Sequence, residues 1–595
     1  MHIGKTRVLG LLAVASIVAS ACGNSTATPT GPAASGATKV PSTSASSATG
    51  DTYPRAETLY TTGKQWGAPS TWNPLDPNAA MGVVGLQYET LFLYDPLKDV
   101  YTPWLAESLG TWDSAKTTYT VKIRQGIKWT DGQALTADDV AFTIQLAKNP
   151  VLGSNLWQYV TDATAPDAST VVVKFNGPAY QEWAQWLYNS PIVPKHIWDA
   201  KNNADILKDT NPNGVGTGPY MYKTHADDRM VWVRNDNWWA ITALKMTAKP
   251  KYIVDIVNGA NSVALGELLQ GGLDLSNNFL PGVASLVAGG YGVTTYYPKA
   301  PYMLAGNTAV LVPNTLKAPL NDAAFRKALA TSINTDDIVT KVYGNIVQKA
   351  DATGLLPNFS KYVDTAQRDA LGFKFDTAKA KSQLAAAGYK DVNGDGFVEN
   401  KDGSPLKLTL EVPDGWSDWM AAETSIATSA GLAGIKIDPQ HPTYDTVVAD
   451  RNGTADAPPK FDLIINNDIQ IGNTPWTWYD YVFRQPLQVG AAKNRNFESY
   501  SSKDAWDLVQ KLDKTPVEDT ATMKTLTSQL QKIQLTDMPV IPLWYNGIWS
   551  QVNNSVWTNW PSDGGNQVLP ATWNGYWQMG AVMMLTQLKA VPPAS

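Results

Sequence analysis

The alternation of apolar and polar positions predicts several short strands. Residues 118–124 read TYTVKIR and residues 169–175 read STVVVKF, with apolar side chains on every second position for most of each run. This period of two is typical of a strand with one buried face. The apolar runs at 406–412 and 461–465 have the length and bounds of strands as well.

A helical pattern separates the first two strands. Thr136 precedes Ala137, Asp138, Asp139 and the run VAFTIQLA, so a threonine cap with an acid at the third position opens a helix. We assign Asp138 and Asp139 to the helix dipole rather than to a catalytic carboxylate pair. Further helices are expected at 323–333, at 378–387 before Gly388, and at 523–535. Interleaved strands and helices predict an α/β protein with more than one mixed sheet.

The first residues carry a different pattern. A basic start with Lys5 and Arg7, an apolar run at 8–18 and three small residues at 19–21 form a secretory signal peptide, which we assign to residues 1–21. The apolar run is shorter than the ~20 residues that cross a bilayer. No later apolar run reaches 18 residues, so we expect no membrane-spanning segment.

Cys22 is the only cysteine of the 595 residues. The sequence Ala19-Ser20-Ala21-Cys22 resembles the bacterial lipobox, although Ala19 stands where leucine is usual. We expect lipidation of Cys22 and anchoring of the exported chain to the outer face of the cell membrane through acyl chains alone. The alternative is an ordinary signal peptide with an incidental cysteine. Residues 22–51, made almost wholly of Ser, Thr, Ala, Gly and Pro after the cysteine, are expected to form a disordered tether.

Length, charge and the absence of certain motifs exclude several classes of function for residues 52–595, the body of the protein. Its length exceeds the ~250–300 residues of a single core and predicts two or three domains. The formal net charge of −6 argues against nucleic acid as a partner. The sequence holds no clustered zinc ligands, no GxSxG elbow, no phosphate loop and no GxGxxG fingerprint. We therefore predict a protein that is not an enzyme and requires no cofactor.

Tryptophan and tyrosine are unusually abundant, with 23 Trp and 25 Tyr against 12 Phe. Several Trp lie in polar or Gly- and Pro-rich surroundings, as in GWSDW at 415–419, TPWTW at 474–478 and WYNGIW at 544–549. Flat rings beside amides and carboxylates suit a sugar, which stacks its C–H faces and hydrogen-bonds its hydroxyls. Most of the 23 are nevertheless expected to fill cores or domain contacts.

Residues 103–146, PWLAESLGTWD followed by TYTVKIRQGIKWTDGQALTADDVAFTIQL, closely resemble the signature segment of the family 5 extracellular solute-binding proteins. These proteins are the peptide, nickel and oligosaccharide receptors of ABC importers. Further matches follow in order along the body: YETLFLYDP (88–96), PIVPKHIW (191–198), GTGPYMY (216–222), RNDNWW (234–239), GELLQGGLDL (266–275), PLNDAAFRKALATSINTDDIV (319–339) and MPVIPLWYN (538–546).

The resemblance implies a two-lobed periplasmic-binding-protein-like α/β fold of type II, with mixed sheets joined by a hinge. Lobe 1 is expected at 52–305, including the extra subdomain of the peptide-binding group at 97–215. Lobe 2 is expected at 306–539, and 540–595 return to lobe 1. Hinge closure would enclose the ligand, and the permease subunits of an ABC importer would receive it from a monomeric receptor.

The expected class of solute is inferred from two sequence segments in the second lobe. Peptide receptors of the group carry a motif like ADYPDP, whose Asp holds the peptide amino terminus. Here 461–483 read FDLIINNDIQIGNTPWTWYDYVF, which places Ile469 or Gln470 at that point and Asp468 one position away. This segment and VPDGWSDWMAAETSIA at 412–427 are similar to the oligosaccharide-binding branch. We predict a cello- or manno-oligosaccharide as ligand, and an oligopeptide or dipeptide is the alternative.

The candidate ligand residues are Trp rings for stacking, Asn side chains for hydroxyls, two residues near the hinge and three in the opening loops of lobe 1. They are Trp416, Trp419, Trp476 and Trp478; Asn466, Asn467, Asn277 and Asn278; Tyr545 and Asn546; and Trp66, Trp72 and Asn73. Trp238 and Trp239 are left out, because the sequence around them is more simply a packed turn.

One segment has the spacing of a twelve-residue calcium loop, with Gly396 at its sixth position. The twelfth position holds Asp in place of the usual Glu, and a polar hairpin turn is the alternative. Any Ca²⁺ bound there is expected to be structural. The expected ligands are Asp391, Asn393, Asp395, Phe397, Glu399 and Asp402.

Two other classes of protein are compatible with parts of the sequence. A secreted glycoside hydrolase would also be rich in Trp, but it needs two carboxylates flanking a cleft, and no hydrolase motif organises the acids here. A surface adhesion protein would account for the anchor and tether but not for a body that closes on a ligand.

Overall fold

The computed structural model describes residues 53–592 except 63–65, 153, 155, 202, 469–471, 473, 491–492 and 571–577. Residues 45–595 form one compact unit. The predictions for the signal peptide, Cys22 and the tether lie outside the described residues. Within the described ranges, no helix combines the length and apolarity that a membrane crossing requires.

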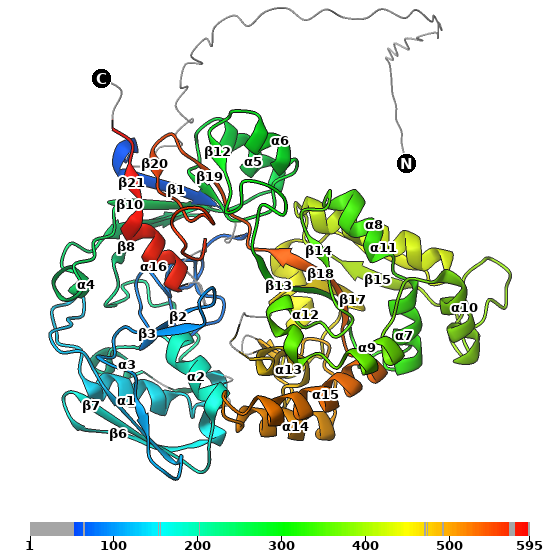
Figure 1. Cartoon of the computed structure of the whole chain (residues 1–595), viewed down its shortest axis with the longest axis horizontal. Helices are drawn as coiled ribbons and strands as arrows, with labels where there is room; N and C mark the ends of the chain where they lie inside the picture. The colour runs from blue at the N-terminus through cyan, green and yellow to red at the C-terminus, as the bar shows by residue number, and fades with distance from the viewer. Residues whose placement is uncertain are drawn as a thin grey trace, which may run out of the picture. The chain divides into compact units, whose positions relative to one another are not determined.

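A seven-stranded mixed sheet organises the first lobe (Figure 1). Strand β1 pairs in parallel with β10 and β11, and the β8–β9–β10 meander is antiparallel. Helices α5 (Asn261–Leu269) and α6 (Val283–Ala288) contact its β11, β19 and β12 edge. In spatial order the strands are β12 (Val293–Thr294), β19 (Gln551–Asn553), β11 (Leu275–Ser276), β1 (Thr58–Thr62), β10 (Tyr252–Ile256), β9 (Arg229–Arg234) and β8 (Tyr220–Ala226).

A six-stranded mixed sheet organises the second lobe, and its buried core includes Val412, Ile465 and Leu543. In spatial order its strands are β14 (Gln348–Lys349), β18 (Ile541–Gly547), β13 (Ala305–Pro313), β17 (Leu463–Asn466), β15 (Leu408–Glu411) and β16 (Ile437–Gln440). The longest helices of this lobe are α7 (Ala323–Ser332), α10 (Thr377–Ala386), α11 (Ser417–Leu432), α14 (Lys503–Asp513) and α15 (Thr520–Asp537).

An antiparallel four-stranded sheet lies inside the segment predicted as the extra subdomain. Its strands are β4 (Thr111–Trp112), β5 (Thr118–Lys122), β7 (Thr170–Phe175) and β6 (Val160–Asp167), and α1 (Ala137–Leu146) packs against β6 and β7 (Figure 1). The predicted capping box is confirmed, because the Thr136 backbone N–H donates to Asp139 Oδ2 at 2.8 Å. Helices α2 (Tyr180–Asn189) and α3 (Lys195–Trp198) follow.

The remaining elements are short. They are β2 (Phe92–Asp95), β3 (Val100–Pro103), α4 (Trp239–Ala243), α8 (Thr335–Asp337), α9 (Thr365–Leu371), α12 (Tyr444–Asn452), α13 (Trp476–Phe483), β20 (Trp557–Thr558), α16 (Gln578–Gln587) and β21 (Lys589–Ala590), with a π-helical turn at Ile338–Val342 and 3-10 turns at Arg55–Glu57, Pro150–Leu152, Leu156–Gln158, Asn203–Asp205 and Pro357–Tyr362.

The chain passes twice between the two large sheets. It leaves the first sheet after β12 for β13, and it returns from β18 to β19. The two crossings are bonded together, because the Ile548 N–H donates to the Leu304 carbonyl at 2.7 Å. Residues 541–547 therefore belong to the second sheet, and the return to lobe 1 comes later than the predicted boundary at 540. These paired crossings are the place for a hinge.

The predicted strands and helices are present with small changes at their ends. The strand predicted at 461–465 is β17, which starts at Leu463, and the helix predicted at 523–535 is the longer α15. Helix α10 ends at Ala386, and Gly388 follows with φ +94°, a conformation that glycine adopts without strain.

A buried carboxylate joins three tryptophans of the first lobe. Glu89 Oε1 accepts the indole N–H groups of Trp104 at 2.8 Å and Trp238 at 3.1 Å, and Oε2 accepts that of Trp239 at 2.7 Å. All four side chains are buried. Burial raises the pKa of Glu89 from its ordinary value of 4.5 to about 7, while the indole N–H groups act in the opposite direction. Trp238 and Trp239 are thus structural, as their surroundings in the sequence suggested.

Candidate ligand cavity

A cavity of about 240 Å³ lies where the two lobes meet. Residues from the first lobe, from the second lobe and from the β18–β19 crossing all contribute to its wall. Its lining consists of Trp66, Met81, Asn261, Asn277, Asn278, Phe279, Gly306, Asn307, Trp416, Asp418, Trp419, Tyr444, Asn467, Asp468, Asn546, Gly547, Ile548, Trp549 and Pro570.

A chain of hydrogen bonds crosses from one lobe to the other at this cavity. Asn278 Nδ2 donates to Asn261 Oδ1 at 2.8 Å, and Asn261 Nδ2 donates to Asp418 Oδ1 at 3.1 Å. The Tyr343 hydroxyl donates to Asp418 Oδ2 at 2.9 Å. Asn261 begins α5 in the first lobe and Asp418 lies in the first turn of α11 in the second, so these contacts require the lobes to be close.

Aromatic side chains form another part of the wall. The ring of Trp66, from the first lobe, lies 4.9 Å from that of Trp416 at an interplanar angle of 44°. Trp416 in turn meets Trp419 edge-on at 4.8 Å and lies nearly parallel to Tyr444 at 5.9 Å. Trp416 therefore stands at the centre of a cluster that joins both lobes.

Three residues that line the cavity, Asn277, Asn307 and Trp416, each have a buried side-chain polar atom without a hydrogen-bond partner among the described residues. Asn277 is 3% exposed, and its Nδ2 donates to the Trp549 carbonyl at 3.0 Å. Since a carbonyl only accepts, this bond fixes the amide orientation, and Asn277 Oδ1 accepts no bond from the part of the chain that the structure describes. The buried indole Nε1 of Trp416 likewise has no acceptor among the described residues. The residues around the cavity thus hold two acceptors, Asn277 Oδ1 and Asn307 Oδ1, and one donor, Trp416 Nε1, that have no partner among the described residues.

The two carboxyl groups at the cavity already have partners within the protein. Burial raises the pKa of Asp418 to about 6, and both of its oxygens accept bonds from the protein. Asp468 Oδ2 pairs with Arg451 Nη1 at 2.6 Å. None of the described lining residues is Lys, Arg or His. A net-neutral polar ligand meets carboxyl groups that are already hydrogen-bonded or ion-paired, and it brings no charge of its own to be desolvated.

The structure brings one group of the predicted ligand residues together at the cavity. Rings and amides from distant parts of the sequence meet there: Trp66, Asn277, Asn278, Trp416, Trp419, Asn467 and Asn546.

The other predicted ligand residues lie elsewhere, in packing or hydrogen bonds of their own. Trp476 and Trp478 are buried in α13, where all residues from Trp476 to Phe483 are buried, and Trp478 packs on Gly354. The Asn466 amide donates to the Tyr481 hydroxyl at 2.9 Å. The Tyr545 hydroxyl donates to the Leu355 carbonyl at 2.8 Å.

The two remaining predictions, both in the opening loops of lobe 1, also lie away from the cavity. Trp72 is buried beside Tyr222 and His225. The Asn73 amide donates to the carbonyls of Ile206 at 2.7 Å and Asp209 at 3.0 Å. Both residues stabilise this loop.

Several lining residues were not among the predictions. Asp418 and Trp549 belong to the GWSDW and WYNGIW segments, whose aromatic and polar mixture was the available signal. Asn261, Asn307 and Tyr444 carry no comparable local pattern. Their place in the wall depends on contacts between distant segments.

The calcium-like loop gathers part of its predicted ligand set. Carboxylate oxygens of Asp391, Asp395 and Glu399 lie within 4.8 Å of one another. Glu399 is 4% exposed and accepts the Val392 N–H at 2.8 Å and Asn393 Nδ2 at 2.6 Å. Asp402 lies outside this group and accepts the backbone N–H and the hydroxyl of Ser404 at 3.0 and 2.7 Å.

The backbone of the same loop is held from within. Asp391 accepts the N–H groups of Gly394 and Gly396 at 2.7 and 2.9 Å. The Phe397 N–H donates to Asp395 Oδ1 at 2.9 Å.

Two lobes with paired crossings and a cavity between them define a solute-binding receptor of the periplasmic type. The profile of the bacterial extracellular solute-binding proteins, family 5, matches residues 100–486, and the chain belongs to this family. It is a receptor that binds a solute and delivers it to the permease of an ABC importer, and it is not an enzyme.

Known relatives and structures agree with this assignment. A periplasmic oligopeptide-binding protein from Thermotoga maritima, solved with mannohexaose bound, is 42% identical; the match covers 91% of this chain and 100% of that one, with a TM-score of 0.86. The oligopeptide-binding protein AppA of Bacillus subtilis is 25% identical over 75% of this chain and 82% of its own. A probable ABC transporter-binding protein of Deinococcus radiodurans is 28% identical over 54% of this chain and 58% of its own.

Proposed function

We propose that the chain captures a β-linked oligosaccharide, a cello- or manno-oligosaccharide, between its lobes and delivers it to an ABC importer. The observation that carries the proposal is the wall of the cavity, in which Trp rings and Asn amides stand beside two carboxylates that already hold protein partners, and in which no described residue is Lys, Arg or His. Sugar hydroxyls both donate and accept, so they match the free Asn277 oxygen and the free Trp416 indole N–H. The mannohexaose bound to the Thermotoga maritima protein supports the same class of ligand.

An oligopeptide is the second candidate, since AppA is an oligopeptide-binding protein. A peptide amino terminus needs a carboxylate, and Asp468 is the cavity residue nearest in sequence to the family's peptide anchor. Its pairing with Arg451 at 2.6 Å leaves less negative charge for an ammonium group. The geometry therefore favours the sugar.

A thermal-shift panel on residues 45–595 separates the two candidates. Cello- and manno-oligosaccharides of two to six units and di- to pentapeptides are compared at equal concentrations. One sugar series is expected to raise the Tm, because binding to the native state stabilises it by about 2.7 kcal/mol at a hundredfold excess over Kd. A shift with peptides and none with sugars would refute the sugar proposal.

We propose that the Asp391 loop holds a structural Ca²⁺ through Asp391, Asp395 and Glu399. Adding CaCl₂ after EDTA treatment is expected to raise the Tm of the unaltered protein. Asp395→Asn should remove this response, because it takes away one of the gathered carboxylates. Asp402→Ala is the matched control and should keep the response, since Asp402 bonds within its own turn. A Tm that is indifferent to calcium would contradict the site.

We propose that the receptor is a monomer held at the outer face of the cell membrane by a lipid on Cys22, after removal of residues 1–21. The chain expressed in bacteria supplied with labelled palmitate is expected to carry the label in the membrane fraction. Cys22→Ser should lose the label, since no other cysteine exists to receive it. Equal labelling of the variant would contradict anchoring at Cys22.

A further inference from the structure

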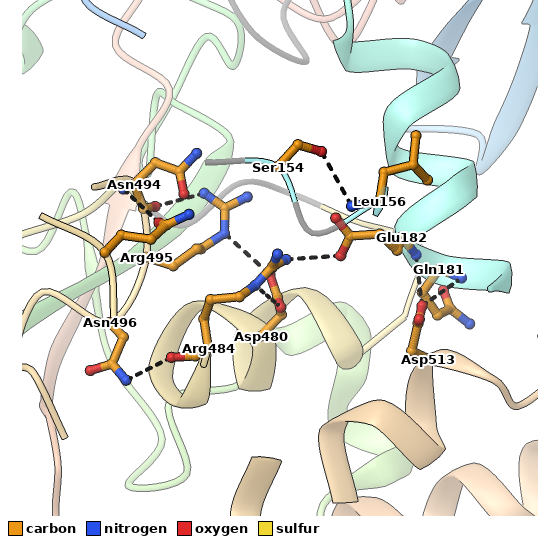
Figure 2. Close-up of polar contacts among 11 residues, drawn as sticks. Ser154, Leu156, Gln181, Glu182, Asp480, Arg484, Asn494, Arg495, Asn496 and Asp513 are labelled. Atoms are coloured by element: carbon orange, nitrogen blue, oxygen red, sulfur yellow. Dashed lines mark hydrogen bonds and ion pairs between the residues drawn. The ribbon is translucent and has the colours of Figure 1, made fainter. Parts of the chain in front are cut away.

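A buried polar cluster, separate from the cavity, joins the extra subdomain of the first lobe to helices of the second (Figure 2). From the first lobe it takes the beginning of α2, and from the second the ends of α13 and α14. Its members are Gln181, Glu182, Asp480, Arg484, Arg495 and Asp513.

The first part of the cluster is a helix cap supplied from the other lobe. Helix α2 begins after Ala179, whose methyl side chain cannot accept a hydrogen bond from the first turn of the helix. Asp513 Oδ1 accepts the backbone N–H groups of Gln181 at 3.1 Å and Glu182 at 2.7 Å instead. Asp513 is 1% exposed and is the last residue of α14. A carboxylate there satisfies two first-turn donors and complements the helix dipole.

The second part is a shared arginine. Arg484 holds Asp480 with two bonds of 2.6 Å within the second lobe, and its Nη2 also lies 2.9 Å from Glu182 Oε2 of α2. Figure 2 shows the guanidinium between the two carboxylates. Arg495 Nε adds a contact of 3.3 Å to Asp480. Arg484 therefore stays paired when Glu182 is withdrawn, so the contact can open without stranding a buried cation.

A third contact extends the cluster toward the segment that precedes α13. The Thr474 hydroxyl donates to Gln181 Oε1 at 2.9 Å, and Gln181 Nε2 donates to the Thr515 carbonyl at 3.4 Å. The bonds that Gln181 and Glu182 of the first lobe make to residues of the second lobe link chain segments on opposite sides of the two crossings. A hinge motion at those crossings that separates the lobes must break them.

We propose that this cluster is a latch for the closed receptor, with Asp513 and Arg484 as positioning residues that hold α2 against the second lobe. None of its members lines the cavity, so the latch acts on the balance between open and closed forms and not through ligand contact. The cluster gathers three carboxyl groups around two guanidinium groups. This excess of carboxyl groups agrees with the pKa of Asp513, which burial raises to about 7 and to which the nearby Glu182 carboxylate adds a further rise.

The test measures closure directly by pulsed electron resonance on residues 45–595. These residues contain no cysteine, so Leu109→Cys and Leu432→Cys, both at exposed positions on opposite lobes, take spin labels selectively. In the ligand-free protein, Asp513→Ala is expected to lower the population of the short-distance form about tenfold relative to the open form. Glu182→Ala, a change from the other lobe, should act in the same direction.

The controls separate the latch from a general loss of stability. Asp513→Asn should retain the short-distance form, because asparagine caps helices as well as aspartate does. Asp507→Ala, an exposed change on the same helix, should have no effect. Equal distance distributions for Asp513→Ala and the unaltered protein would overturn the latch.

A second readout rests on the proposed function. The dissociation rate of mannohexaose is expected to rise about tenfold in Asp513→Ala, because the closed form that retains the ligand is less populated. If mannohexaose does not bind the unaltered protein, the sugar proposal fails, and the ligand-free distances still decide the latch.

Discussion

Replacing Trp416 by alanine is expected to weaken mannohexaose binding about thirtyfold. Trp416 lies at the centre of the aromatic wall, in contact with Trp66, Trp419 and Tyr444, and its indole N–H has no acceptor among the described residues. Buried aromatic anchors of this kind contribute about 2 kcal/mol or more to binding, which corresponds to that change in Kd. Isothermal titration of the variant and the unaltered protein measures it.

Trp157→Ala is the matched control for this result. Trp157 is 46% exposed and does not line the cavity, so its removal should leave the Kd of mannohexaose unchanged. Equal affinities for Trp416→Ala and Trp157→Ala would mean that the ligand does not use this wall.

Replacing Glu89 by glutamine is expected to destabilise the core of the first lobe. Both oxygens of Glu89 accept indole N–H groups, and an amide NH₂ cannot accept one. The substitution therefore leaves at least one buried donor facing another, at a cost of about 2–3 kcal/mol. The shift in Tm at pH 5.5 measures the loss, and Glu107→Gln, at an exposed position, should stay within about 0.5 kcal/mol of the unaltered protein.

The same residue predicts a dependence on pH. Because burial raises the pKa of Glu89 from 4.5 to about 7, its stabilising contribution is fully present below pH 4.5 and is lost as the pH rises through 7. The amide of Glu89→Gln does not titrate, so the difference in stability between the variant and the unaltered protein should be larger at pH 5.5 than at pH 8. If the difference in stability instead increases with pH, the hydrogen bonds from the indoles lower the pKa of Glu89 more than burial raises it.

Local sequence patterns were sufficient for much of the fold. The period of two at 118–124 and the Thr136 cap correspond to β5 and α1, because a half-buried strand and a helix start are decided by neighbouring residues. The bounds of lobe 2 depend on the partner of β18, which is a contact between distant segments. For that reason the crossing after Gly547 could not be read from the local sequence.

The cavity was only partly predictable for the same reason. Trp416 and Trp478 have similar polar, aromatic surroundings in the sequence, yet Trp416 lines the cavity while Trp478 lies in a helix that is covered on every side. Asn261 carries no local signal, and its position becomes informative only through its bond to Asp418, 157 residues away. Composition can thus indicate which types of residue line the cavity, whereas the fold decides which individual residues do so.

The central claim is that the cavity between the lobes takes a neutral oligosaccharide. Titration calorimetry of residues 45–595 with mannohexaose and with a pentapeptide of free amino terminus tests it most directly. The account predicts saturable binding of mannohexaose at one site and no heat of binding for the peptide. Saturable binding of the peptide, lost in Asp468→Asn and retained in Trp416→Ala, would contradict it.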